Sequence, residues 1–315
     1  MSQSHIVNIS EEWYDIMKSR HMDLFLIPTV LLTSVTLLVN PVLFLCIVCF
    51  HSLRQETRYL LLANTLLADM LFLTINLAVV SCNTVGMDIP YVPCNFMLLS
   101  SVTTYTCSVI TFTLMVVDTY VAVRWPLRYN EFLSVSRVRK IIVSLWALSS
   151  LCPVSLLAFF KMVIPSEQPR KVCLVLIALH SMEVKVSIHL YFIIGISVCS
   201  ALIIYCYIRL YMITKTSGIW CDRYSRARMT LLAHALLLML YFTPALVFAV
   251  ELSLLGREEK PSETAVWINL VNMCVLMLLP RFCTPYLYIL RYREIYKTLQ
   301  NVLWKNRHRS QIRTA

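Results

Sequence analysis

Long apolar runs separated by short polar stretches make up most of this chain. Seven runs are nearly free of charged residues, and each reaches the roughly 20 residues that a helix needs to cross about 30 Å of hydrocarbon. The runs cover approximately residues 24–50, 59–82, 92–123, 141–160, 186–212, 229–250 and 265–290. The pattern therefore predicts an all-α fold, a seven-transmembrane helix bundle over residues 24–291.

Polar segments flank the predicted bundle at both ends. Residues 1–23 form an N-terminal tail in which Asn8 opens an Asn-Ile-Ser sequon, a glycosylation site if the tail lies outside the cell. Residues 292–304 gather apolar side chains on one helical face among basic residues, which predicts a short amphipathic helix on the inner leaflet. Residues 305–315 are expected to be a cytoplasmic tail.

Composition and charge agree with a membrane protein and set its orientation. The chain is 58% hydrophobic and 14% charged, too apolar for an ordinary soluble domain. The net charge of +11 is spread over short loops, which argues against nucleic acid as a partner. Loops one, three and five with the C-terminal tail hold nineteen Lys and Arg against four acids, whereas the other side holds eight against eleven. The positive-inside rule then predicts that the N-terminus lies outside, and we expect the protein in the plasma membrane.

Other function classes find little support in the sequence. Neither a His-Glu-x-x-His nor a Gly-x-Ser-x-Gly motif is present, so we expect no enzyme, no cofactor and no metal site. A small membrane transporter is one function class that a bundle of membrane helices leaves open. A transporter would need internal repeats and broken, glycine-rich helices. Only Gly195 of the four glycines lies well inside a run. Substrate flux across vesicles would discriminate a transporter from a membrane protein that does not move a substrate.

The end of the third run carries the most informative motif. Asp118 lies at the foot of a stretch without charge, and a basic loop follows it. An acid there is costly unless it finds a partner or water, which indicates function. The pattern Asp118-x-Tyr120-x-Ala-x-x-x-Pro-Leu-x-Tyr129 resembles the end of the third helix and the second inner loop of rhodopsin-like (class A) G-protein-coupled receptors. Thr119 departs from that family, which usually has arginine here.

Further motifs extend the resemblance over nearly the whole chain, in the family's order. They are Asn40 before Pro41, Asn64-x-x-Leu-Leu-Ala-Asp69, Trp146, Tyr241-Phe242-Thr243-Pro244 and Thr284-Pro285-Tyr286-Leu287-Tyr288. The resemblance implies a receptor that binds a ligand outside and passes a conformational change to a heterotrimeric G protein inside. The last of these motifs, with the Leu-Arg-Tyr that follows Pro126, looks most like the odorant-receptor-like branch and its orphan relatives.

The resemblance also implies a disulfide and a buried polar network. The family joins the positions of Cys94 and Cys173, and an oxidising exterior permits that bond. It uses the acid at Asp69 to anchor a sodium ion, and Ser108 matches the same site. The expected network consists of Asn40, Asp69, Ser108, Arg281 and Thr284. Here we predict that the guanidinium of Arg281 takes the place of the cation, because a pair explains how two charges survive in hydrocarbon. The alternative is that Arg281 faces a polar cleft or backbone carbonyls.

The predicted activation switch combines helix hinges with residues at the inner end. Pro244 and Pro285 should kink their helices, and a kink makes a hinge. The switch set is Asp118, Thr119, Tyr120, Tyr207, Phe242, Pro244, Pro285 and Tyr288. Thr119 cannot pair with its neighbouring acid as a cation, so Asp118 must use Thr119, Arg124, Arg128 or another base of the loop. The sequence leaves two outcomes open, high basal activity or weak coupling to the G protein.

The ligand pocket is placed by the resemblance at the outer ends of spans three, five, six and seven. Its candidate residues are Met97, Ser101, Val102, Tyr105, Phe242, Ala245 and Cys274. None of them is an acid, so an amine held by a carboxylate of span three is disfavoured. A small, mainly apolar ligand with one or two hydrogen-bonding groups fits better.

Overall fold

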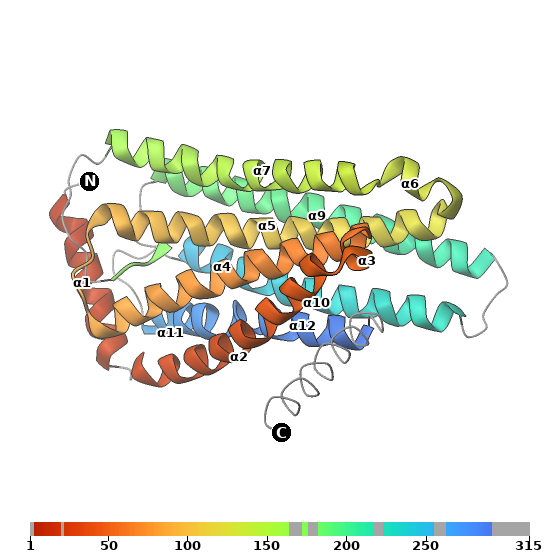
Figure 1. Ribbon diagram of the computed structural model, residues 1–315. Helices are drawn as coiled ribbons and strands as arrows, with labels where there is room; N and C mark the ends of the chain where they lie inside the picture. Colours follow the sequence, from red (N-terminus) through yellow and green to blue (C-terminus); the bar gives the residue numbers. More distant parts are fainter. Residues whose placement is uncertain are drawn as a thin grey trace, which may run out of the picture.

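Long helices lie side by side along one direction, and the short helix α1 crosses one end of them (Figure 1). The computed structural model describes residues 3–19, 22–163, 172–175, 182–216, 223–254 and 263–291. The predicted helix 292–304 and tail 305–315 lie outside the described residues. Within the described part, six helices are long and apolar enough to cross a membrane, and Ala235–Glu251 adds a shorter apolar stretch.

Each predicted span corresponds to a helical segment. These segments are α2 (Met22–Cys49), α4 (Thr57–Val85), α5 (Tyr91–Arg124), α7 (Val135–Val163), α9 (Met182–Thr216), α10 (Arg223–Leu254) and the succession α11 (Glu263–Val271), η2 (Asn272–Leu276) and α12 (Leu279–Arg291). Short helices α3 (His51–Arg54), η1 (Pro126–Arg128) and α6 (Tyr129–Phe132) lie in the connections. The predicted seven-helix bundle is confirmed.

The outward faces of the bundle are apolar. Leu38 on α2, Val143 on α7 and Met239 on α10 are 73%, 70% and 68% exposed. Such side chains would be unfavourable in water but suit a hydrocarbon environment. Inside the bundle, the side chains of Asn64, Thr111 and Trp146 link three helices. Trp146 Nε1 donates to Asn64 Oδ1 at 2.9 Å, and Asn64 Nδ2 donates to Thr111 Oγ1 at 2.9 Å, so these two hydrogen bonds connect α7 and α5 through Asn64 on α4.

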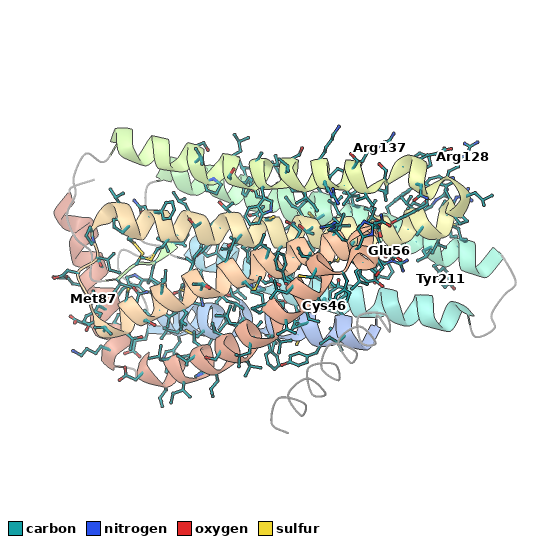
Figure 2. The ribbon with its side chains drawn as sticks, in the orientation of Figure 1. Cys46, Glu56, Met87, Arg128, Arg137 and Tyr211 are labelled. Atoms are coloured by element: carbon teal, nitrogen blue, oxygen red, sulfur yellow. A yellow bond between two sulfur atoms is a disulfide. The ribbon has the colours of Figure 1, made fainter. Side chains whose placement is uncertain are left out.

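The two ends of the bundle differ in chemistry. We call them the disulfide end, which carries Cys94 and Cys173, and the basic end, which carries Asp118 and the loop after it. Figure 2 shows Met87 at the first end, and Arg128 and Arg137 at the other.

A helix in the N-terminal tail, which the sequence did not predict, covers the disulfide end. α1 (Gln3–Ser19) buries Trp13 and Met17, which share one face because they are four residues apart. Ser10 Oγ accepts a hydrogen bond from the backbone N–H of Val172 at 3.3 Å. The sequon of Asn8 lies within this helix, and its glycosylation stays a prediction.

The expected disulfide is present, and a neighbouring asparagine holds the loop that contains it. The Cα atoms of Cys94 and Cys173 are 5.7 Å apart. Asn83 on α4 accepts from the backbone N–H of Cys173 at 2.8 Å and donates to its carbonyl at 3.1 Å. α4 ends two residues later at Val85, and the next residue, Gly86, turns the chain with a φ of 69°. The loop is thus fixed to both α4 and α5.

We expect Gly86→Ala to lower the thermal unfolding midpoint of the purified protein. The left-handed backbone at Gly86 costs an L-residue roughly 1–2 kcal/mol, and an added Cβ would collide with the side chain of Tyr14 on α1. The matched control is Gly195→Ala in α9, where an added Cβ meets nothing within 4 Å. Alanine favours a helix by roughly 0.5–1 kcal/mol over glycine, so this control should unfold at the native temperature or above. An unchanged unfolding midpoint for Gly86→Ala would contradict the left-handed backbone and the close contact with Tyr14 described for Gly86.

Candidate functional site

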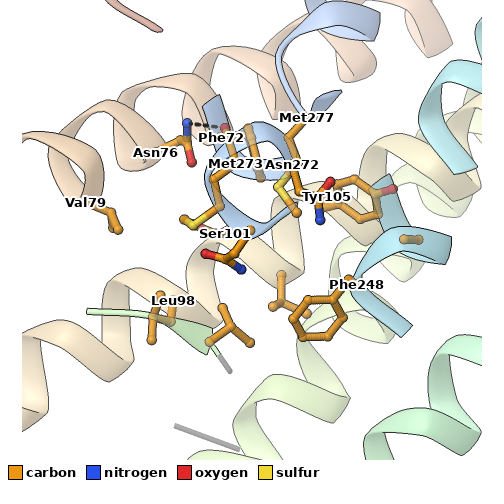
Figure 3. A pocket seen from close by; sticks show the side chains of 14 residues that line it. Phe72, Asn76, Val79, Leu98, Ser101, Tyr105, Phe248, Asn272, Met273 and Met277 are labelled. Carbon is orange, nitrogen blue, oxygen red and sulfur yellow. Dashed lines mark hydrogen bonds between the residues drawn. The ribbon is translucent and has the colours of Figure 1, made fainter. Parts of the chain in front are cut away.

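A cavity opens inside the bundle toward the disulfide end (Figure 3). It is lined by Phe72, Asn76, Val79, Leu98, Ser101, Val102, Tyr105, Val175, Ala245, Phe248, Asn269, Asn272, Met273 and Met277. Val79 and Leu98 pack with the disulfide in one buried cluster, and Val175 packs against that cluster. Most of the wall is apolar, and its polar groups are three amides and two hydroxyls.

The predicted pocket residues fall into two groups. Ser101, Val102, Tyr105 and Ala245 line the cavity. Three others do not. Met97 packs against the disulfide cluster, Phe242 lies in the main core and Cys274 is buried. The centre of the cavity therefore lies closer to α4 than the resemblance suggested.

Residues that the sequence analysis missed line the opposite wall. Phe72 and Asn76 come from α4, and Asn272, Met273 and Met277 come from the seventh span. A polar residue inside an apolar run was a usable signal for the asparagines. The local geometry was not, because η2 is a π-helix in which Met277 N–H donates to the carbonyl of Asn272 at 2.9 Å. Short π-helical turns are rare in proteins, and those that occur are often found at functional sites.

A buried ion pair lies beside the cavity. Arg281 Nε is 3.4 Å from Asp69 Oδ1, and both side chains are fully buried. Ser108 donates to Asp69 Oδ1 at 3.0 Å, and Tyr241 donates to Asp69 Oδ2 at 2.8 Å. One carboxylate thus receives contacts from α5, α10 and α12 while it belongs to α4.

Aromatic rings surround the guanidinium. Its central carbon lies 3.6 Å from the centroid of the Phe72 ring, 5.3 Å from that of Tyr105 and 5.6 Å from that of Tyr241. The Nη1 group of Arg281 also donates to the carbonyl of Met277. Cation–π attraction is strongest where water is excluded, so the rings offset part of the cost of burying the charge. Phe72 and Tyr105 face Arg281 and also line the cavity, so one pair of rings separates the two sites.

The arrangement does not suit a sodium ion. Sodium would need the carboxylate oxygens of Asp69 and the hydroxyl of Ser108 as ligands. Both Asp69 oxygens already accept hydrogen bonds, and the cation that faces Oδ1 is Arg281. A second positive charge beside the guanidinium would be repelled, so the chain provides its own cation at this position.

Two other members of the predicted network have different positions. Thr284 lies next to it, since its Oγ1 is 3.4 Å from the hydroxyl of Tyr241 and donates to the carbonyl of Pro280 at 2.7 Å. Asn40 is fully buried, but its amide makes no hydrogen bond with any described residue. The structure therefore does not join Asn40 to Asp69, which differs from the expectation.

At the basic end, hydroxyl groups hold Asp118. Its Oδ1 accepts from Thr57 at 3.1 Å and from Tyr129 at 2.6 Å, and the hydroxyls of Thr57 and Tyr129 also touch each other. Burial, and next the hydrogen bond to Asp118, raises the pKa of the Tyr129 hydroxyl, so it remains a donor. Thr119, an expected partner, instead donates to the carbonyl of Met115 at 2.9 Å.

The remaining switch residues connect this end to the core through aromatic contacts. Tyr120 lies edge-on to Trp125 and Tyr205 at centroid distances of 6.0 and 6.2 Å. Tyr288 donates to the sulfur of Met115 at 2.9 Å, and Phe112 packs between Tyr288 and Tyr241. Pro244 and Pro285 lie inside α10 and α12, and Tyr207 packs against the core from α9.

Comparison with known proteins gives two matches. The family described as "7 transmembrane receptor (rhodopsin family)" matches residues 39–275. A human protein named "Probable G-protein coupled receptor 148" is 34% identical over 297 residues, which cover 90% of this chain and 83% of that protein. The family match includes Asp69 and Asp118 and ends before Arg281.

We expect Arg281→Leu to destabilise the protein by about 3–5 kcal/mol, because it leaves the buried charge of Asp69 unpaired. The double variant Asp69→Leu/Arg281→Leu should recover most of this loss, since replacing both partners by apolar residues is often neutral. The free energies of unfolding of the native protein, Asp69→Leu, Arg281→Leu and the double variant together measure the coupling between the two side chains. The exposed Arg139→Leu on α7 is the control for loss of a positive charge. A double variant as unstable as the sum of the singles would contradict the pair.

Salt identity provides a separate test. The unfolding midpoint of the native protein should be the same in sodium chloride and in choline chloride at equal ionic strength. In Arg281→Leu the carboxylate of Asp69 and the hydroxyl of Ser108 are no longer opposed by a guanidinium, so sodium should raise the midpoint. Equal sodium stabilisation of both proteins would show that the arginine does not occupy the cation position.

Proposed function

Because the chain belongs to the rhodopsin family of seven-transmembrane receptors, we propose that it binds a small, mainly apolar or odorant-like molecule in the cavity and signals to a cytoplasmic heterotrimeric G protein. The observation that carries this proposal is the shared wall between the cavity and the buried ion pair. Phe72 and Tyr105 contact a ligand on one side and the guanidinium of Arg281 on the other. A ligand that moves either ring changes the surroundings of the charge.

The ion pair is a suitable element for transmitting such a change. Asp69 connects four helices, and two of them, α10 and α12, contain prolines within their spans. Tyr105 adds a direct contact, since its hydroxyl donates to the carbonyl of Tyr241, three residues before Pro244. A small shift at Tyr105 is therefore applied close to a predicted hinge, and packed helices respond to such shifts by moving as rigid bodies.

The chemistry of the two ends supports the direction of signalling. We place the disulfide end outside the cell, because disulfides persist in oxidising surroundings. We place the basic end in the cytoplasm by the positive-inside rule. Membership in the receptor family supports the plasma membrane as the location of this multi-pass protein. Arg128 and Arg137 lie at that end, where a G protein would bind (Figure 2).

In the family, an arginine at the position of Thr119 usually pairs with the neighbouring acid. Here the hydroxyl contacts of Asp118 would replace that ion pair. Thr57, Tyr129 and Asp118 join α4, α5 and α6 without any contribution from the side chain of Thr119. The same observation favours a second candidate, a receptor-shaped protein with weak or no G-protein coupling, because Thr119 offers no cation to a partner.

Basal G-protein activation in cells, corrected for surface level, tests the proposal. The native chain should signal above mock-transfected cells, and Thr119→Arg should signal no more than the native chain if Asp118-Thr119-Tyr120 is a working variant. If the native chain does not signal and Thr119→Arg restores signalling, the second candidate would be supported. Silence from both would overturn the coupling proposal.

We further expect Tyr129→Phe to raise basal activation by about two- to tenfold. It removes one hydrogen bond to Asp118, which contributes roughly 0.5–1.5 kcal/mol, and 1.4 kcal/mol corresponds to a factor of ten. Tyr286→Phe is the matched control, since that side chain is 36% exposed on the outer face of α12. Unchanged or lower activation in Tyr129→Phe would contradict the restraining role of these contacts.

A further inference from the structure

Three asparagines line the cavity, and each already uses its amide nitrogen. Asn76 Nδ2 donates to the carbonyl of Met273 at 3.3 Å, the contact drawn as a dashed line in Figure 3. Asn272 Nδ2 donates to the carbonyl of Pro244 at 3.2 Å. Asn269 Nδ2 donates to Glu251 Oε2 at 3.2 Å. Each amide is therefore held by an acceptor that belongs to the protein.

These partners fix which way the amides point. A backbone carbonyl can only accept a hydrogen bond, so turning Asn76 or Asn272 over would set oxygen against oxygen. The carboxylate of Glu251 imposes the same orientation on Asn269 when it is ionised. In this orientation each side-chain oxygen can accept a hydrogen bond from another molecule, and each amide nitrogen keeps one further N–H.

Two of these oxygens lack any partner. Asn269 Oδ1 and Asn272 Oδ1 are buried and accept no hydrogen bond from any described residue, and the same holds for Glu251 Oε1 behind Asn269. Buried polar groups in native proteins are nearly always satisfied, so two orphan acceptors in one cavity wall require an explanation. A bound molecule with hydrogen-bond donors is one that the geometry favours.

The hydroxyl groups of the cavity do not supply those donors. Ser101 donates its proton to the carbonyl of Met97 at 3.0 Å, and Tyr105 donates its proton to the carbonyl of Tyr241. Among the described residues, the buried polar atoms of this wall that make no hydrogen bond at all are the side-chain oxygens of Asn269 and Asn272. The cavity thus offers acceptors to a ligand that brings donors.

The π-helix η2 is a second, independent observation at the same place. It begins at Asn272, and Met273 and Met277 of the same segment also line the cavity. A π-helical turn inserts an extra residue and is less stable than an α-helical turn, which is why such turns are kept mostly at functional sites. The turn and the orphan oxygen of Asn272 therefore mark the same point of the wall.

We propose that the cavity takes a compact aromatic ligand that carries N–H donors, with an aromatic amine as its simplest form. The N–H groups donate to Asn269 Oδ1 and Asn272 Oδ1 once these buried amides shift toward the ligand, and the ring rests against the apolar wall of Phe72, Tyr105 and Phe248. The cavity volume of about 70 Å³ limits the ligand to a single ring, and binding a ring requires side chains of the wall to shift outward. This inference rests on the proposed function, because it names the ligand class of the proposed receptor.

Three anilines test the donor requirement. Aniline, N-methylaniline and N,N-dimethylaniline carry two, one and no N–H donors, and acetophenone is an acceptor-only ring of similar size. Ligand-observed NMR on the purified protein in lipid nanodiscs measures the four affinities. We expect aniline to bind about tenfold more tightly than N,N-dimethylaniline, as loss of one to two hydrogen bonds implies. Methylation increases hydrophobicity, so non-specific partition into lipid would give the opposite order.

Variants locate the binding. Asn269→Leu and Asn272→Leu should each bring the affinity ratio of aniline to N,N-dimethylaniline close to one, whereas the control Asn95→Leu should keep it. Asn95 is a buried amide of α5 that does not line the cavity. The aniline series on the native protein remains decisive if either variant fails to fold.

The inference is overturned if the native protein binds none of the probes, binds all three anilines equally, or prefers acetophenone. It is also overturned if the ratio survives in both cavity variants. Binding is measured without a G protein, so a donor preference in a chain that never signals would sustain the ligand class and remove only the coupling. A signalling chain without donor preference would sustain the receptor and remove this inference.

Discussion

The ion pair between Asp69 and Arg281 is the interaction on which the rest of the bundle depends. Neither charge has any exposed surface, and an isolated charge in such surroundings costs several kcal/mol even after relaxation. The neighbouring helices must therefore supply compensation. Ser108 and Tyr241 donate to the carboxylate, and the rings of Phe72, Tyr105 and Tyr241 cover the guanidinium. The positions of α4, α5, α10 and α12 relative to one another follow from satisfying this pair.

The same requirement connects the cavity to the inner part of the bundle. Rings that face a charge cannot move without altering its stabilisation, and two of these rings also form the cavity wall. Below the pair, Phe112 packs against Tyr241 and Tyr288, and Tyr288 contacts Met115, whose carbonyl receives the hydroxyl of Thr119. A continuous set of packed side chains thus runs from the cavity to the segment around Asp118, and it needs no sodium ion to hold it together.

Much of this arrangement was predictable from the sequence. The spans followed from the apolar runs, and the disulfide followed from the resemblance to the receptor family. Arg281 was expected to meet Asp69 because two charges in hydrocarbon must find each other or another polar partner. The hydroxyl partners of Asp118 were not predictable. Thr57 lies 61 residues away in the chain and Tyr129 lies 11 away, so only the packing of α4 and the connection after α5 brings them together.

The sequence by itself determined the number of spans, their order and the charges that needed partners, because hydrophobicity and charge are properties of single residues and of short windows. Tertiary structure alone decided which partners were used. The π-helix at Asn272, the position of the cavity nearer α4 than expected and the separation of Asn40 from the polar network all depend on how helices distant in the chain pack together. Hydrogen bonds are short and directional, so a residue's chemistry says that it needs one, and only the packed bundle says with whom.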